Sequence, residues 1–174
     1  MNHPHVIFSH GHLSSPQSSK IVELSPVARD CGFDVEAIDY RDLRDDPVGR
    51  SRRLIERLEQ LEGPVVLVGS SMGGYVSMAA AERVPVTGLF LMAPALFLEH
   101  YVEGGVSPET YHPKTDNVAI VHGWRDEIIP WSSSLRFAER SHVTLHLLDA
   151  DHGLHGCLPS IAGYLEEFLR QLPD

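Results

Sequence analysis

The sequence predicts an α/β protein: a three-layer α/β/α sandwich built on a mostly parallel sheet of six strands. Six short apolar segments alternate with amphipathic segments along the whole chain, and strands that alternate with helices are typical of parallel sheets with right-handed crossovers. In addition, the segment Val65–Val68 is apolar at every position, as expected for a strand that helices cover on both faces.

The predicted strands are the short apolar runs. We expect them at residues 5–9, 33–38, 65–68, 86–92, 118–121 and 143–148. Their length and their content of Val, Ile, Leu and Phe are typical of strands buried in a sheet.

The segments between the strands carry apolar residues three or four positions apart, which is the spacing of one buried helix face. We expect helices at 18–31, from 46 to the Gly63-Pro64 stop, through 76–81, after Pro130 and through 161–169. Pro47 at the start of the second helix and Gly32 after the first fit the usual boundary preferences of these residues.

Chain length and charge restrict the organisation and the partners. The chain has 174 residues, which suffices for a sizeable core, and we expect a single domain over residues 1–174. The formal net charge is −10, from 24 acidic and 14 basic side chains. Such a surface repels phosphate groups, which argues against nucleic acids and anionic membranes as partners.

The start of the chain and its cysteines predict a cytoplasmic protein. Residues 1–5 lack the basic start and apolar core of a signal peptide. No apolar run approaches the roughly 20 residues that cross a bilayer. Cys31 and Cys157 lack the spacing of a zinc site, and two reduced thiols fit the cytoplasm.

One long irregular stretch, from Pro94 to Asn117, contains Gly104-Gly105 and three prolines. Irregular segments of this length often carry function. Residues 95–117 are therefore a candidate short lid or substrate loop, with an ordinary mobile surface loop as the equal alternative.

The strongest chemical motif is Gly69-Ser70-Ser71-Met72-Gly73. It follows the strand at 65–68 and precedes a helix, the context of the G-x-S-x-G elbow, which presents its middle serine as a nucleophile. Glycines suit the outer positions because side chains there would clash with the crowded backbone. We therefore select Ser71 over Ser70, which lacks the correct glycine frame.

A serine hydroxyl is a weak nucleophile at neutral pH and needs a base and a carboxylate that orients the base. His152 lies between the last strand and the last helix, and Asp126 lies just after the fifth strand. Together they have the chain order Ser, Asp, His that accompanies this elbow. His155 and Glu127 are the alternatives for the base and the acid.

The intermediate of acyl transfer also needs two backbone N–H donors for its oxyanion. The amide of Met72, directly after the nucleophile, is the first. For the second we expect the amide of His12, or else that of Leu13, from the loop after the first strand.

Residues for substrate contact come from two loops. In the loop after the first strand, the candidates are the side chains of His10 and Leu13. In the 95–117 segment, Leu96, Phe97 and Tyr101 are candidates for an apolar wall, with packing in the core or the loop as the alternative.

The motifs Ser9-His10-Gly11, Gly69-x-Ser71-x-Gly73, His122-Gly-x-x-Asp126-x-x-x-Pro130 and Asp151-His152-Gly153 together resemble the α/β-hydrolase superfamily over residues 6–169. The short chain is similar to compact, lidless bacterial serine hydrolases of the dienelactone-hydrolase-like branch. It departs from the dienelactone hydrolases themselves, because Ser71 stands where they have a cysteine. The resemblance implies a minimal form of the fold that lacks the first two strands, with strand order 2-1-3-4-5-6. It also implies acyl-transfer chemistry without a cofactor or a metal.

The expected function is a serine hydrolase that cleaves small carboxylic esters through an acyl-enzyme intermediate, with a small-molecule acyl substrate as its partner. Thioester or peptide cleavage by the same triad stays open, as does a noncatalytic binding protein on a hydrolase fold. A homodimer also stays open, because apolar loop residues could build its interface.

Overall fold

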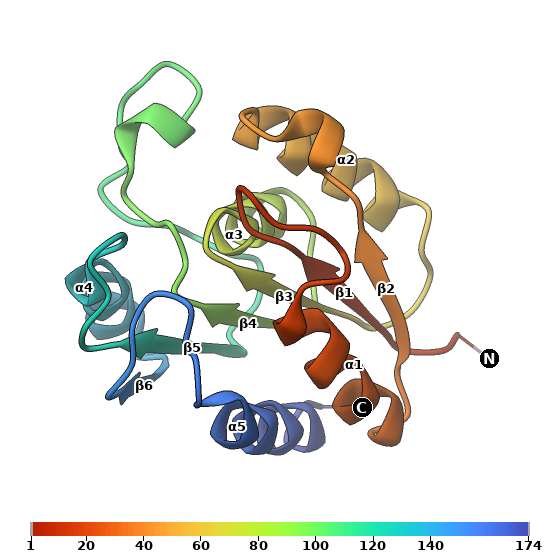
Figure 1. The fold of residues 1–174 in the computed structure, drawn as a ribbon. Helices are drawn as coiled ribbons and strands as arrows, with labels where there is room; N and C mark the ends of the chain where they lie inside the picture. The colour runs from red at the N-terminus through yellow and green to blue at the C-terminus, as the bar shows by residue number, and fades with distance from the viewer. Residues whose placement is uncertain (1, 174) are drawn as a thin grey trace.

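The structure, a computed structural model, describes residues 2–173. Its strands are β1 (His5–Ser9), β2 (Asp34–Ile38), β3 (Val65–Ser70), β4 (Gly88–Met92), β5 (Val118–Gly123) and β6 (Thr144–Leu148). They form a sheet in the order β2-β1-β3-β4-β5-β6, in which each neighbouring pair is parallel (Figure 1). The predicted fold class and strand order are confirmed.

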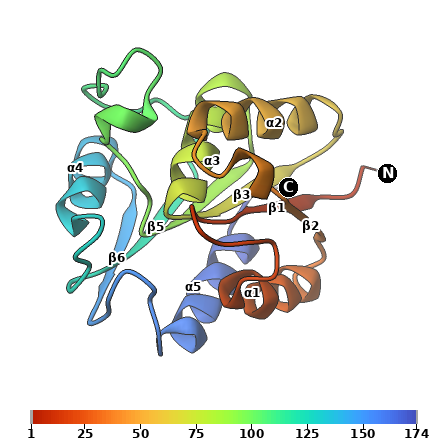
Figure 2. The same cartoon turned by 45° about the horizontal axis from the view of Figure 1, so that its top comes forward.

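Helices cover both faces of the sheet. The α-helices of the described range are α1 (Ser19–Asp30), α2 (Pro47–Glu59), α3 (Met72–Arg83), α4 (Trp131–Ser141) and α5 (Leu158–Arg170), and two 3-10 turns are η1 (Arg41–Leu43) and η2 (Glu99–Tyr101). Helices α1 and α5 pack side by side on one face, and α2, α3 and α4 pack on the other (Figure 2). Within residues 2–173, none of these helices is long and apolar enough to cross a membrane.

The composition of β3 follows from its position between the two layers of helices. Successive side chains of a strand point to opposite faces of the sheet. Accordingly Val66 and Val68 join the core beneath α1 and α5, whereas Val65 and Leu67 join the core beneath α2, α3 and α4. The segment Val65–Val68 of β3 is therefore apolar at every position because both faces of the strand are buried there.

Strands β3 and β5 both extend two residues beyond the apolar runs that predicted them. Ser70 pairs with Met92 of β4, and His122 pairs with Leu147 of β6. The predicted ends of these strands, at residues 68 and 121, are therefore two residues too early. Strand pairing uses backbone groups, so it continues past the point where the side chains become polar.

The 95–117 segment crosses α3 and contains η2 (Figure 1). Its first residue, Ala95, donates its backbone N–H to the Ser71 carbonyl at 3.0 Å. Near its end, Lys114 donates its backbone N–H to the Ala81 carbonyl of α3 at 2.7 Å. The first residue of the segment is thus attached to the turn before α3, and a residue near its end is attached to α3 itself.

Candidate active site

Ser71 occupies the turn between β3 and α3 in a conformation that non-glycine residues rarely adopt. Its φ is 54° and its ψ is −117°, and the backbone N–H of Ser71 donates to the Met92 carbonyl at 3.0 Å. A Cβ atom at Gly69 would collide with the Gly73 carbonyl, and one at Gly73 would collide with the Ser9 carbonyl. The expected steric reason for both glycines is confirmed, and the turn holds Ser71 in a strained geometry.

The structure brings together the three side chains that the sequence selected. His152 Nε2 lies 3.0 Å from Ser71 Oγ, and His152 Nδ1 lies 2.7 Å from Asp126 Oδ2. The other carboxylate oxygen, Asp126 Oδ1, accepts backbone N–H groups from Ile128 at 2.9 Å and from Ile129 at 2.8 Å. The result is a continuous hydrogen-bonded chain from a buried carboxylate to a serine hydroxyl.

The alternative base and acid lie outside this chain. The His155 side chain is exposed, and its Nδ1 contacts Asp151 Oδ2 at 3.3 Å. Glu127 is exposed, next in sequence to the buried Asp126. The geometry therefore favours His152 and Asp126 for these positions.

A second histidine, His122, contacts the same carboxylate and was not selected from the sequence. Its Nε2 lies 3.1 Å from Asp126 Oδ2 and 2.9 Å from the Ile129 carbonyl, and its Nδ1 lies 2.7 Å from Ser134 Oγ. Because both neighbours of Nε2 are acceptors, Nε2 carries the proton. Burial lowers the pKa of His122, so the ring is neutral and Ser134 donates its hydroxyl to Nδ1. The four-residue spacing between His122 and Asp126 was the available sequence signal.

His10 does not line the site, so the prediction that it contacts substrate is wrong. Its side chain is buried, with Nδ1 2.8 Å from the Gly11 carbonyl. Its Nε2 accepts the backbone N–H of Tyr40 at 2.9 Å. His10 instead ties the loop after β1 to the end of β2.

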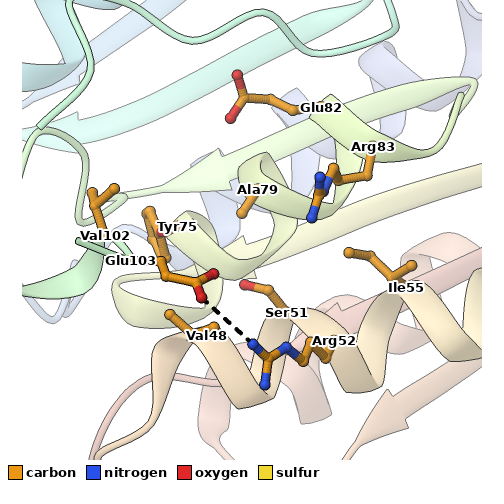
Figure 3. A pocket seen from close by; sticks show the side chains of 10 residues that line it. All are labelled: Val48, Ser51, Arg52, Ile55, Tyr75, Ala79, Glu82, Arg83, Val102 and Glu103. Carbon is orange, nitrogen blue, oxygen red and sulfur yellow. Dashed lines mark ion pairs between the residues drawn. The ribbon is translucent and has the colours of Figure 1, made fainter. Parts of the chain in front are cut away.

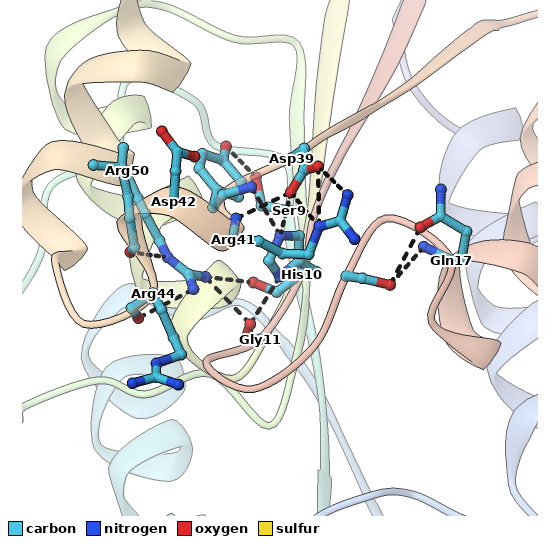
Figure 4. Close-up of polar contacts among 12 residues, drawn as sticks. Ser9, His10, Gly11, Gln17, Asp39, Arg41, Asp42, Arg44 and Arg50 are labelled. Carbon is cyan, nitrogen blue, oxygen red and sulfur yellow. Dashed lines mark hydrogen bonds and ion pairs between the residues drawn. The ribbon is translucent and has the colours of Figure 1, made fainter.

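A buried arginine, Arg50 of α2, shapes the loop after β1 (Figure 4). Its guanidinium donates to five backbone carbonyls at 2.9–3.2 Å, those of His10, Gly11, His12, Leu43 and Arg44. In a trans peptide the N–H points opposite to the C=O. The bonds to the Gly11 and His12 carbonyls therefore turn the amides of His12 and Leu13 away from Arg50.

These amides and the amide of Met72 are candidates for oxyanion binding. Met72 is the first residue of α3, where a backbone N–H has no acceptor within the helix. The loop lies close to the nucleophile: a Cβ atom at Gly11 would be 3.6 Å from Ser71 Cβ. Both predicted donors thus belong to segments that meet at Ser71.

A cavity of about 370 Å³ opens beside Ser71 and His152. Its other walls come from the loop after β1, the start of α1, the end of β3, η2 and the loop after β5. The residues are Gly11–Ser14, Ser18, Lys20, Ser70, Tyr101, Ile128 and Ile129. Leu13 and Tyr101 therefore line it, as expected. Among the residues that the structure describes, no cluster of His, Cys, Asp or Glu could hold a metal ion.

Leu96 and Phe97 are not wall residues of this cavity, and their prediction as substrate contacts is wrong. Leu96 is fully buried in the core beneath α2, α3 and α4. Phe97 packs against Tyr111, with ring centres 5.0 Å apart, and lies 4.0 Å from the guanidinium carbon of Arg136. Apolar character alone does not distinguish a wall from a core, and the fold directs both side chains inward.

The chain is similar to known proteins both in sequence and in fold. Residues 5–120 match the family described as uncharacterised protein family UPF0227. A solved structure from Xanthomonas campestris, assigned to the alpha/beta superfamily of hydrolases, is 32% identical, with a TM-score of 0.85 over 97% of this chain and 99% of that one. The chain belongs to UPF0227 and to the α/β-hydrolase superfamily. A second Xanthomonas campestris structure, a serine hydrolase without a lid, is 21% identical and shares the fold of this UPF0227 member, with a TM-score of 0.77 over 97% of this chain and 83% of that one.

Curated relatives of this α/β hydrolase are longer proteins. The mitochondrial palmitoyl-protein thioesterase ABHD10 of rat and of mouse is 27% identical over 188 residues, covering 79% of this chain. The alignment spans 63% of those proteins, less than two thirds of their length.

The two buried histidines of this α/β hydrolase predict a loss of stability in mild acid. Burial lowers the pKa of both His10 and His122 below the ordinary value near 6.5. The unfolded chain therefore binds protons at these residues before the folded chain does. The contribution of each histidine to the free energy of unfolding is complete above about pH 6.5. At lower pH the free energy of unfolding decreases by up to about 1.4 kcal/mol per pH unit for each histidine.

Urea unfolding at pH 7.5, 6.5 and 5.5 measures this effect. The variant His10→Gln should flatten the slope, whereas His155→Gln, at an exposed position, should leave it unchanged. Equal unfolding free energies of the wild type across this range would show that the buried rings accept protons without cost.

Proposed function

We propose that this protein is a serine hydrolase that cleaves small carboxylic esters through an acyl-enzyme intermediate. The observation that carries the proposal is the hydrogen-bonded chain from Asp126 through His152 to Ser71, which ends at a cavity. Membership in the α/β-hydrolase superfamily supports the same reaction class.

In the first half of the proposed reaction, Ser71 Oγ attacks the carbonyl carbon of the ester while His152 Nε2 takes the hydroxyl proton. The carbonyl oxygen becomes an oxyanion, which the amides of Met72 and His12 stabilise. The intermediate collapses as the bond to the leaving group breaks, and His152 returns its proton to the departing alkoxide. An alcohol leaves, and Ser71 keeps the acyl group.

In the second half, His152 takes a proton from a water molecule that attacks the acyl carbon. Collapse of the second intermediate releases the carboxylic acid, and the proton on His152 returns to Ser71 Oγ. Asp126 stabilises the imidazolium that forms in both halves, because Asp126 Oδ2 lies 2.7 Å from His152 Nδ1.

A thioester is the second candidate substrate. It is favoured by the name of the curated relatives, which are palmitoyl-protein thioesterases. The same residues would act in the same order, with a thiol as the leaving group.

Labelling with a fluorophosphonate, read as intact-protein mass, tests the proposed nucleophile. We expect one adduct on the wild type, mapped to Ser71 by peptide mass and absent from Ser71→Ala. Ser70→Ala is the matched control, since the neighbouring hydroxyl is removed while the nucleophile stays.

An adduct that persists in Ser71→Ala, or no adduct on folded wild type, would contradict the proposal. The second outcome would favour a noncatalytic binding protein on this fold. If labelling succeeds, parallel rates with matched esters and thioesters of the same acyl group decide between the two substrate classes.

A further inference from the structure

One lysine lies in the wall of the cavity beside Ser71 and has no role in the chemistry proposed above. Lys20, the second residue of α1, lines this cavity together with Ser71 and His152. Lysine is rare in this chain, which has two, at positions 20 and 114. A charged side chain at this position bears directly on what the cavity can bind.

Among the described residues that line the cavity, Lys20 alone carries a permanent charge near neutral pH. The lining contains no Asp, Glu or Arg, and its other ionisable side chains are Tyr101, His12 and His152. The His12 ring pairs with a carboxylate outside the lining, because His12 Nε2 lies 2.5 Å from Asp45 Oδ1. A substrate that enters the cavity therefore meets one positive side chain and no carboxylate on its wall.

The Lys20 ammonium has no hydrogen-bond or ion-pair partner among residues 2–173. The other lysine does have one, since Lys114 Nζ donates to the Arg83 carbonyl at 2.8 Å. The guanidinium groups of Arg29 and Arg83 also lack a partner in the described range, but both side chains are exposed, whereas Lys20 is partly buried. Lys20 is therefore the one partly buried cation of this range that is left without a partner.

Partial burial without a partner makes the charge of Lys20 costly. Burial lowers the pKa of Lys20, and the Asp151 carboxylate opposes that effect only in part. This carboxylate is itself engaged, because Asp151 Oδ2 lies 3.3 Å from His155 Nδ1. An anion in the cavity would supply the missing partner, and opposite charges attract more strongly in a partly desolvated site than in water.

The cavity between α2 and α3 has a different distribution of charge (Figure 3). Its volume is also about 370 Å³, but its wall carries both signs of charge, from Arg52, Arg83, Glu82 and Glu103. Arg52 Nη2 lies 3.8 Å from Glu103 Oε1. The charges on that wall balance one another, so the unbalanced cation is a particular property of the cavity beside Ser71.

The surroundings of Lys20 reinforce its charge at short range. Ser18, which caps the start of α1, lines the same cavity, and the first turn of the helix contains no acidic residue. The start of a helix carries a partial positive charge. The net charge of −10 repels anions from the molecule as a whole. The attraction by Lys20 therefore acts on a group that already lies in the cavity.

The size of the cavity means that Lys20 and Ser71 act on one ligand. Its volume of about 370 Å³ is near the lower end of the range for small-molecule sites, about 300–1,000 Å³. A molecule whose carbonyl group lies at Ser71 occupies the space that Lys20 borders. A single positive charge balances a single negative charge, which favours a carboxylate over a doubly charged phosphate monoester.

We propose that Lys20 is a specificity-determining residue that binds a single negative charge of the substrate, such as a carboxylate, while Ser71 attacks the ester carbonyl. The preferred substrates are then esters or thioesters that carry an anionic group in their acyl part or in their leaving group. This inference rests on the proposed function and specifies its substrate. Loss of the Lys20 charge should weaken the cleavage of anionic substrates and leave that of neutral ones unchanged.

Pairs of substrates that differ in charge but hardly in shape test the proposal, each pair a carboxylate and its primary amide. The pair meta-acetoxybenzoate and meta-acetoxybenzamide has this group on the leaving side, and the pair monophenyl adipate and phenyl adipamate has it on the acyl side. We expect the wild type to prefer the carboxylate in at least one pair, by at least about tenfold in kcat/KM. The pair that shows the preference identifies the part of the substrate that Lys20 contacts.

The variant Lys20→Met removes the charge and keeps an unbranched apolar side chain. Its kcat/KM for the preferred carboxylate should fall by at least about tenfold, whereas that for the paired amide should stay unchanged. Lys20→Arg keeps the charge and should retain the preference. Lys114→Met is the matched control, because it makes the same change in net charge at a lysine outside the cavity lining.

If Lys20→Met does not fold, Lys20→Gln takes its place, since it also removes the charge. Equal wild-type rates on carboxylate and amide in both pairs, or a preference that survives the loss of the Lys20 charge, would overturn the role of Lys20 and leave the proposed hydrolase intact. Absence of fluorophosphonate labelling, together with no hydrolysis of any of these substrates, would instead overturn the proposed function itself and the role of Lys20 with it.

Discussion

We expect replacement of Ser71 by alanine to lower kcat for the proposed ester hydrolysis by on the order of 10⁶-fold, and replacement of His152 by alanine to lower it by a similar factor. The two residues should act as one unit, since Ser71 Oγ lies 3.0 Å from His152 Nε2, which is its base in the proposed mechanism. Without the base the hydroxyl stays a weak nucleophile, and without the hydroxyl the base has no nucleophile to activate.

The double variant is the informative one, because its loss should be no larger than that of either single variant. Steady-state rates on one small carboxylic ester measure all three losses. Thermal unfolding checks that each variant folds. Losses that multiply in the double variant would mean that the two side chains contribute independently and do not form a triad.

Replacing Arg50 by methionine lowers the free energy of unfolding by at least about 3 kcal/mol. The substitution removes the donor of the His10, His12 and Arg44 carbonyls, whereas the Gly11 carbonyl keeps His10 Nδ1 and the Leu43 carbonyl keeps the Asp46 N–H. Each buried polar group that loses its partner costs about 1–3 kcal/mol. For a chain of this length, 3 kcal/mol corresponds to a decrease in Tm of about 6–12 °C.

Activity should also fall in Arg50→Met, by about 100-fold in kcat, because the loop that carries the His12 amide loses its anchor. Arg50→Lys keeps the positive charge but offers three donors in place of the planar fork of five. It should therefore lose most of the same stability. Circular dichroism melting and kcat on one ester measure the two effects, and a Tm equal to that of the wild type in Arg50→Met would exclude the anchoring role.

The amino-acid sequence alone predicted the elements, their order and the residues that meet at Ser71. This succeeded because each signal is local. Val65–Val68 is apolar at every position because both faces of the strand are buried, and helix faces repeat every three or four residues. Gly69 and Gly73 are required by a turn of a few residues, and a parallel sheet brings the residues after its strands to one edge.

The tertiary structure decided which side chains face the cavity and which hold the active site in place. His10 lies in the loop after β1 and Leu96 lies in the 95–117 segment, the two segments from which substrate contacts were predicted. Both side chains are buried in the structure. Arg50 reaches backbone carbonyls 38–40 residues away in the sequence, and His122 reaches Ser134 on α4. These contacts depend on how helices pack on the sheet, and no local pattern of residues encodes that packing.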